Sequence, residues 1–249
     1  MISRRDVLAG MAASLVPLNA FGNTSKQARI IVSLADNENQ GIVPIKSSLG
    51  NGQDPKSNLY WGALYGAKTH FKRMPNWSVK SINSDNPFVL DAFELSHVAF
   101  PAAKIRLEAW DGAKQRHAVR AYFQDLRNAS SSAELVGFVG HNALMDAAVP
   151  NLPVLTSVRK SNFEKGRKGF VIACSSASYF NSYHHTLGVN SFVMTKGSMA
   201  PEAYVIEGIL TAWLSGQDAN KARSEAAKQY AKYQKIPIRN ANWLFGVKT

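Results

Sequence analysis

The sequence runs Leu135-Val136-Gly137-Phe138-Val139-Gly140-His141-Asn142 in one place and Lys168-Gly169-Phe170-Val171-Ile172-Ala173-Cys174-Ser175-Ser176 in another, and these two stretches decide the fold. Each is a short apolar run of the kind that forms a central strand of a parallel sheet, and each ends in small or polar residues. Ligands of open parallel sheets bind beyond the carboxyl ends of the strands. We therefore expect His141 and Cys174 at one edge of one sheet.

Strand and helix patterns alternate on both sides of these two runs. Strand patterns cover residues 28–35, 79–82, 104–110 and 191–195, and helix patterns cover 59–73, 115–128, 201–214 and 219–235. Another helix is expected to begin shortly after Cys174. This alternation predicts an α/β fold, a three-layer sandwich in which helices flank a mainly parallel sheet. Residues 23–249 are expected to form a single domain, since their number suffices for a proper core.

The first residues predict an export signal. Arg4 and Arg5 precede an apolar run from Val7 to Leu18, which is too short for a membrane span of roughly 20 residues. This run lacks a polar face, which argues against an ordinary amphipathic helix. A small residue, Ala20, follows at a suitable cleavage position, although the point of cleavage stays open. Residues 1–22 are therefore interpreted as a twin-arginine signal peptide, and the protein as periplasmic or secreted.

Composition argues against several classes of protein. The net charge is +12, but the basic residues are scattered, which favours a solvated basic surface over specific nucleic-acid binding. There is no second long apolar run, so no stable membrane span is expected. The chain has no phosphate-binding loop, dinucleotide fingerprint or paired-cysteine motif, and its histidines lack metal-ligand spacing, so we expect neither cofactor nor metal. Its oligomeric state stays open.

One cysteine, Cys174, is present, so no internal disulfide can form. A thiol in an exported protein is either buried and inert or kept for its reactivity. A nearby base such as His141 and the start of a helix both favour the thiolate. The two hypotheses are a Cys174–His141 catalytic dyad and a buried structural cysteine beside an ordinary loop histidine.

The two stretches quoted above resemble the histidine and cysteine strands of the caspase-like cysteine peptidases, clan CD, and occur in the same order. The resemblance implies a caspase-like sheet, peptide or protein substrates, Cys174 as nucleophile and His141 as general acid or base. It also implies an oxyanion hole made by backbone amides near both residues, with Gly140, Asn142 and Ser175 as candidates. Two features depart from the family: Asn142 replaces its usual glycine, and the 33-residue interval is short. The alternative function is a catalytically inactive caspase-like binding module of the bacterial envelope.

Further polar residues are expected at the same edge. Residues 36–58 form a polar connection after the first expected strand, and Asp36, Asn37 and Gln40 follow that strand directly. Their side chains suit substrate recognition or a metal ion, but turn hydrogen bonds are the favoured interpretation. Asp146 fits two roles, orienting His141 or capping a helix. Residues 198–202 fit either a pocket wall or the cap of the following helix.

Overall fold

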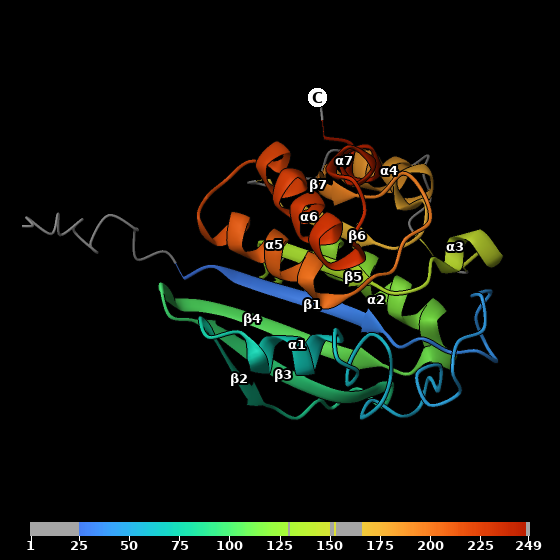
Figure 1. Ribbon diagram of the computed structural model, residues 1–249. Coiled ribbons are helices and arrows are strands. Elements are labelled where there is room, and N and C mark those ends of the chain that lie inside the picture. Colours follow the sequence, from blue (N-terminus) through green and yellow to red (C-terminus); the bar gives the residue numbers. More distant parts are fainter. Residues whose placement is uncertain (1–24, 129, 150–151, 153–165, 248–249) are drawn as a thin grey trace, which may run out of the picture.

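The computed structural model describes residues 25–128, 130–149, 152 and 166–247. In this part of the chain a seven-stranded sheet has the order β2-β3-β4-β1-β5-β6-β7 (Figure 1). The strands are β1 (Gln27–Ser33), β2 (Trp77–Ser81), β3 (Val89–His97), β4 (Phe100–Trp110), β5 (Leu135–Val139), β6 (Lys168–Ile172) and β7 (Asn190–Met194). The five neighbouring strands β4, β1, β5, β6 and β7 are parallel. At one edge, β3 is antiparallel to both β2 and β4. The expected α/β class with a mainly parallel sheet is confirmed.

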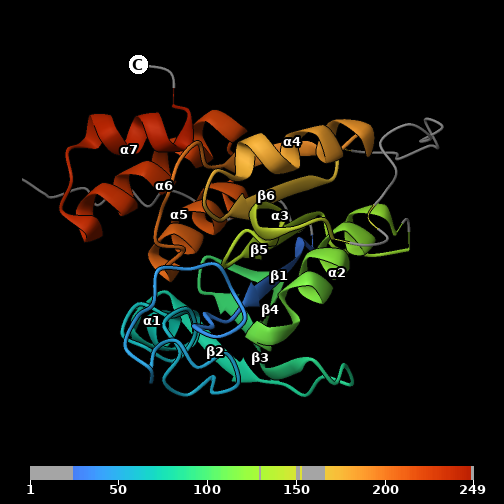
Figure 2. The same cartoon turned by 90° about the vertical axis from the view of Figure 1, so that its right-hand side faces the viewer.

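Helices cover both faces of the sheet (Figure 2). The helices α1 (Ala67–Arg73), α5 (Ala203–Leu214), α6 (Ala219–Gln234) and α7 (Ile238–Phe245) pack on one face. The other face carries α2 (Gln115–Arg127), which follows the short 3-10 turn η2 (Gly112–Lys114), together with α3 (Ala143–Asp146) and α4 (Ser176–Thr186). The arrangement is compatible with a three-layer sandwich.

The central strands supply a core to each face. Side chains alternate along a strand, so Ile30 and Val32 of β1 enter the core under α5, while Ile31 enters the core under α2. All five residues of β5 are buried. Each large apolar side chain buried in this way contributes about 1.5–3 kcal/mol to folding. The continuous apolar runs of the sequence thus reflect strands that are covered on both sides.

The expected helix over residues 59–73 is wrong in its first half. Residues 59–66 form successive turns, and α1 begins only at Ala67. The reason is a close backbone approach: a Cβ on Gly62 would lie 1.9 Å from the carbonyl oxygen of Lys56. The Asn58 carbonyl oxygen also accepts the first N–H groups of these turns, so the chain is held in a compact loop.

Three elements, β3, α3 and α7, were not expected from the sequence. The strand β3 joins β4 through Val98-Ala99, which lacks the Gly, Asn or Asp that marks most tight hairpin turns. The helix α7 begins directly after Pro237, whose fixed φ suits a helix start as well as a helix end.

The expected signal peptide, residues 1–22, lies outside the described residues. Among the helices that the structure does describe, none has the length and apolar character needed to cross a membrane.

Candidate active site

The two key strands are neighbours. In the parallel pair β5–β6, Val139 lies opposite Ile172, so His141 and Cys174 each follow by two residues at the same edge of the sheet. Neighbouring strands lie about 4.8 Å apart, which brings the two strand ends together. The Asn142 side chain joins them, because its Nδ2 donates to the Cys174 carbonyl oxygen at 2.8 Å. The expected meeting of the two strand ends is confirmed.

Gly140 sets the path of the chain into His141. Its φ is +142°, a conformation that L side chains rarely adopt, and a Cβ there would lie 2.6 Å from the Ser33 carbonyl oxygen. Glycine is therefore required at this position on steric grounds.

His141 is 7% exposed, and its Nε2 lies 2.8 Å from Oδ2 of Asp146. The same carboxyl accepts the Gly41 N–H and the Gln115 side-chain amide, both at 3.4 Å. In the neutral ring, Nε2–H donates to the carboxylate and Nδ1 is left as the proton acceptor. Asp146 thus occupies the orienting position. The other hypothesis for it fails, because the cap of α3 is Asn142, whose Oδ1 accepts the Leu144 N–H at 3.1 Å.

Cys174 is partly exposed and contacts the loop after β7. The Met199 N–H donates to Sγ at 3.4 Å, and Sγ lies 3.6 Å from the Met199 carbonyl oxygen. A protonated thiol can donate to that oxygen, whereas a thiolate can accept from that N–H. Within the described residues, no hydrogen bond joins Cys174 directly to His141. Each of the two side chains is held by its own partner.

A strained turn carries Cys174 from β6 into α4. Ser175 has φ 50° and ψ 30°, the left-handed region, and serves as the cap residue of α4. Non-glycine residues in this region are uncommon and cluster at functional sites. The turn places Cys174 beside the positive end of an 11-residue helix, where negative charge is stabilised.

The three candidate oxyanion residues have structural roles in this structure. The Gly140 N–H donates to the Ile172 carbonyl at 3.2 Å, and the Ser175 N–H donates to the Gly197 carbonyl at 2.9 Å. Both polar ends of the buried Asn142 amide are used as described above. Their participation in an oxyanion hole stays a prediction.

The polar side chains after β1 make turn hydrogen bonds, as favoured above. Asp36 Oδ1 accepts two N–H groups of its own turn, at 2.9 and 3.1 Å. Asn37 pairs with the Ile45 backbone through both ends of its amide. Gln40 donates to the carbonyl oxygens of Leu34 and Gly112 at 2.8 and 3.0 Å. Any direct contact of these side chains with a substrate stays a prediction.

Two tyrosines near Cys174, Tyr60 and Tyr230, were not expected from the sequence, whereas Glu202 belongs to the stretch 198–202 that was expected to form a pocket wall or a helix cap. Burial raises the pKa of Tyr60, and the nearby Cys174 raises it further. Tyr230 of α6 accepts the Ala200 N–H at 3.2 Å. Burial also raises the pKa of Glu202, the N-cap residue of α5. Its side chain makes no capping hydrogen bond and instead accepts from Tyr204 and Gln234. Tyr60 and Tyr230 come from a loop and a helix far apart in sequence, so no local pattern identifies them.

A cavity of about 570 Å³ opens beside the His141–Asp146 pair. Its lining includes Asp146, Asn39 and Gly41 together with Lys114, Arg116 and His117. In the described part of the chain, no group of three or more His, Cys, Asp or Glu residues could hold a metal ion.

No protein-family model, no curated protein and no solved structure matches this chain.

Proposed function

We propose that this protein is an exported caspase-like cysteine peptidase in which Cys174 is the nucleophile and His141 the general acid and base. One observation carries the proposal: His141 and Cys174 hold matching positions, two residues past the Val139–Ile172 pair, on adjacent parallel strands. The carboxylate of Asp146 acts as the positioning group for His141. The order of the parallel strands also agrees with a histidine strand beside a cysteine strand, as the resemblance implies.

The reaction follows from these positions. The thiol proton moves to Nδ1 of His141, and the resulting thiolate sulfur attacks the peptide carbonyl carbon. The C–N bond then breaks, and the imidazolium returns the proton to the leaving amine. Water, deprotonated by His141, hydrolyses the thioester and releases the acid and the free thiol. The Met199 N–H, 3.4 Å from Sγ, stabilises the thiolate before attack.

The surroundings of the pair suit a peptide substrate. The lining of the cavity of about 570 Å³ includes Asp146, the hydrogen-bond partner of His141, so a peptide bound there would contact the positioning carboxylate. The loop that carries Met199 contacts the Cys174 thiol through the Met199 backbone.

The test is labelling of the purified protein with a chloromethyl ketone peptide library. In wild type, a subset of the peptides is expected to label one thiol per molecule at a higher rate than they label free cysteine. No peptide is expected to label Cys174→Ala. His141→Ala, with the thiol retained, serves as the matched control and is expected to label at the rate of free cysteine. A wild-type rate equal to that of His141→Ala would overturn the dyad.

The second candidate function is a catalytically inactive caspase-like binding module. It is favoured by the engaged N–H groups of Gly140 and Ser175 and by the separate partners of Cys174 and His141. Peptides bound equally by wild type and Cys174→Ser, with no cleavage product by mass spectrometry, would support it over the peptidase.

We also propose that residues 1–22 direct export through the twin-arginine route to the periplasm or the medium. The support is the Arg4-Arg5 pair ahead of a short apolar run. A lone cysteine also means that folding needs no disulfide formed after transport.

A further inference from the structure

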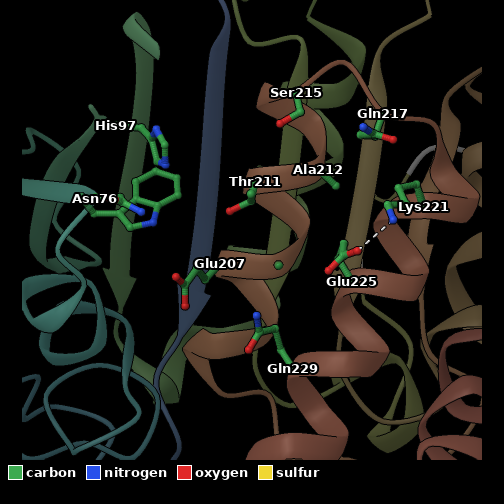
Figure 3. A pocket seen from close by; sticks show the side chains of 12 residues that line it. Asn76, His97, Glu207, Thr211, Ala212, Ser215, Gln217, Lys221, Glu225 and Gln229 are labelled. Carbon is green, nitrogen blue, oxygen red and sulfur yellow. Dashed lines mark ion pairs between the residues drawn. The ribbon is translucent and has the colours of Figure 1, made fainter. Parts of the chain in front are cut away.

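A second cavity, of about 320 Å³, lies along α5 from Glu207 to Ser215 (Figure 3). One wall is formed by Asn76, Trp77 and His97, where β2 begins and β3 ends. The opposite wall is formed by α5 and α6. Its volume is at the small end of the range for small-molecule pockets, roughly 300–1,000 Å³. We call it the α5–α6 groove.

Both helices present a line of polar side chains to this groove. Ten of the twelve residues of α5 are buried, and the two exceptions, Glu207 and Thr211, are four residues apart. Ser215 continues the line just past the helix, and a second line on α6 has the same spacing. Residues four apart lie on one face of a helix, so each line faces one way. The two lines are Glu207, Thr211, Ser215 and Lys221, Glu225, Gln229.

The floor between the two lines is made of small residues. A Cβ on Gly208 would lie 3.1 Å from the Glu225 carbonyl oxygen, so glycine lets the two helices approach closely. Ala212 is the next small residue along α5, and it is buried. The groove is therefore open along the helix, over about 12 Å from Glu207 to Ser215 at 1.5 Å per residue.

Each charged side chain of the lining already has a hydrogen-bond or ion-pair partner in the protein. Glu207 accepts from Nε2 of His70 at 2.8 Å, and Glu225 lies 3.2 Å from Lys221 Nζ and 3.0 Å from Lys228 Nζ. The groups left over are neutral. Five hydroxyl or amide side chains of the lining have no hydrogen-bond partner within the described residues: Asn76, Thr211, Ser215, Gln217 and Gln229. In the loop after β1, by contrast, the amides of Asn37 and Gln40 are used internally.

The aromatic wall is neutral as well. Burial lowers the pKa of His97, so its ring is uncharged at neutral pH. Its Nδ1 accepts the Ala99 N–H at 3.1 Å, which places the ring proton on Nε2 as a donor. The ring packs edge-on against Trp77, with 4.6 Å between the centroids. The wall combines an apolar ring with one polar donor.

We propose that the α5–α6 groove binds a short neutral oligosaccharide. Sugar hydroxyls both donate and accept hydrogen bonds, and so do the free hydroxyl and amide side chains of the lining. Trp77 and His97 line the groove but are only 7% and 9% exposed, so the hydrogen-bonding side chains supply most of the contact with the ligand. The carboxylates and the ammonium group of the lining are already engaged by protein partners, which leaves the neutral side chains to bind a ligand. This inference does not depend on the peptidase proposal, since no residue is shared with the Cys174 site.

The test is titration of the full-length protein with cellobiose, maltose and N,N′-diacetylchitobiose by ligand-observed NMR, at low and high salt. Spermidine serves as the cationic probe. At least one disaccharide is expected to bind at millimolar concentration, with no dependence on salt. The double variant Thr211→Val, Gln229→Leu is expected to weaken that binding about tenfold or more, since it removes two hydrogen-bonding groups.

The matched control is Gln124→Leu, the same kind of change at an exposed site on α2, which should bind like wild type. Gln229→Leu alone gives a second test should the double variant have a lowered melting temperature. Binding by neither wild type nor control, equal binding by the groove variants, or salt-sensitive binding of spermidine alone would each overturn the proposal.

Discussion

At the scale of single residues, the Asp146 carboxylate joins several parts of the candidate site through hydrogen bonds. It accepts hydrogen bonds from His141 at 2.8 Å and from Gly41 and Gln115 at 3.4 Å. The shortest of these goes to the ring nitrogen that faces away from proton transfer. A carboxylate in that position both fixes the ring and stabilises its protonated form.

Asp146→Asn removes the charge and keeps the shape. The alkylation rate of Cys174 by iodoacetamide is expected to fall about tenfold or more, because the imidazolium that accompanies the thiolate loses its counter-charge. Asp146→Glu should recover part of the rate, which a merely structural role would not predict. Stopped-flow alkylation at neutral pH measures both variants. Rates equal to wild type in Asp146→Asn would show that the carboxylate does not act on the reaction.

Asn142 is expected to matter for stability. It is fully buried, caps α3 and holds the Cys174 carbonyl. Asn142→Ala loses a cap worth about 1 kcal/mol and leaves a buried carbonyl unpaired at about 1–3 kcal/mol. The free energy of unfolding in urea should therefore drop by about 2–4 kcal/mol. Asn220→Ala, at an exposed helical position, is the control and should change it by less than about 0.5 kcal/mol. A small loss in Asn142→Ala would mean that water replaces both bonds.

At the scale of elements, the layer of α2 and α4 contains a buried histidine between two hydroxyl groups. Nε2 of His184 lies 2.6 Å from the Tyr122 hydroxyl, and Nδ1 lies 3.0 Å from Oγ of Ser191. Burial lowers the pKa of His184 to about 3. The unfolded chain, with an ordinary histidine pKa near 6.5, binds this proton first as the pH falls.

The sign of the pH effect follows. Between pH 6.5 and about 3 the unfolded state holds more protons at His184 than the folded state. The free energy of unfolding therefore decreases as the pH is lowered through this range. The contribution of this group is at most about 1.4 kcal/mol per pH unit, and it is fully present above pH 6.5. Urea unfolding at pH 7.5, 6.0 and 5.0 should show a steeper decline in wild type than in His184→Gln. Parallel curves for the two proteins would mean that His184 is protonated in the folded state.

Local patterns predicted the elements whose residues face a core on both sides. The runs ending at Val139 and Ala173 are apolar throughout because helices cover both faces of β5 and β6. The same logic brought His141 and Cys174 to one edge. What the patterns missed depends on contacts distant in sequence. Tyr230 reaches the loop beside Cys174 from α6, and the close approach of Gly62 to Lys56 replaces the start of a helix by turns.

At the scale of the whole molecule, one helix connects the two candidate sites. The helix α5 begins beside Glu202, in the loop that contacts Cys174, and lines the α5–α6 groove from Glu207 onward. Its length of 12 residues corresponds to about 18 Å. Because α5 is almost wholly buried, the two sites are rigidly spaced. A ligand held in the groove would therefore keep a fixed distance from the Cys174 edge.

The proposed export also concerns the whole molecule, because the twin-arginine route carries proteins that have already folded. The described domain suits that route: it has two packed cores and a single cysteine, so folding needs no oxidising compartment. Replacing Arg4 and Arg5 by lysine keeps the positive charge and removes the arginine pair. We expect this double variant to stay in the cytoplasm as the uncleaved precursor, while wild type appears outside in a shorter form.

Immunoblots of cytoplasmic and periplasmic fractions measure both species. The control is Cys174→Ala with the arginine pair intact, which should be exported like wild type because it leaves the signal unchanged. The comparison separates targeting from folding, since both variants keep the residues that form the cores. Equal periplasmic amounts of the lysine variant and wild type would show that the apolar run acts through a route that does not need the arginine pair. Cys174 would then belong to a protein that folds after transport, and a lone thiol would have to survive an oxidising compartment while the chain is still unfolded.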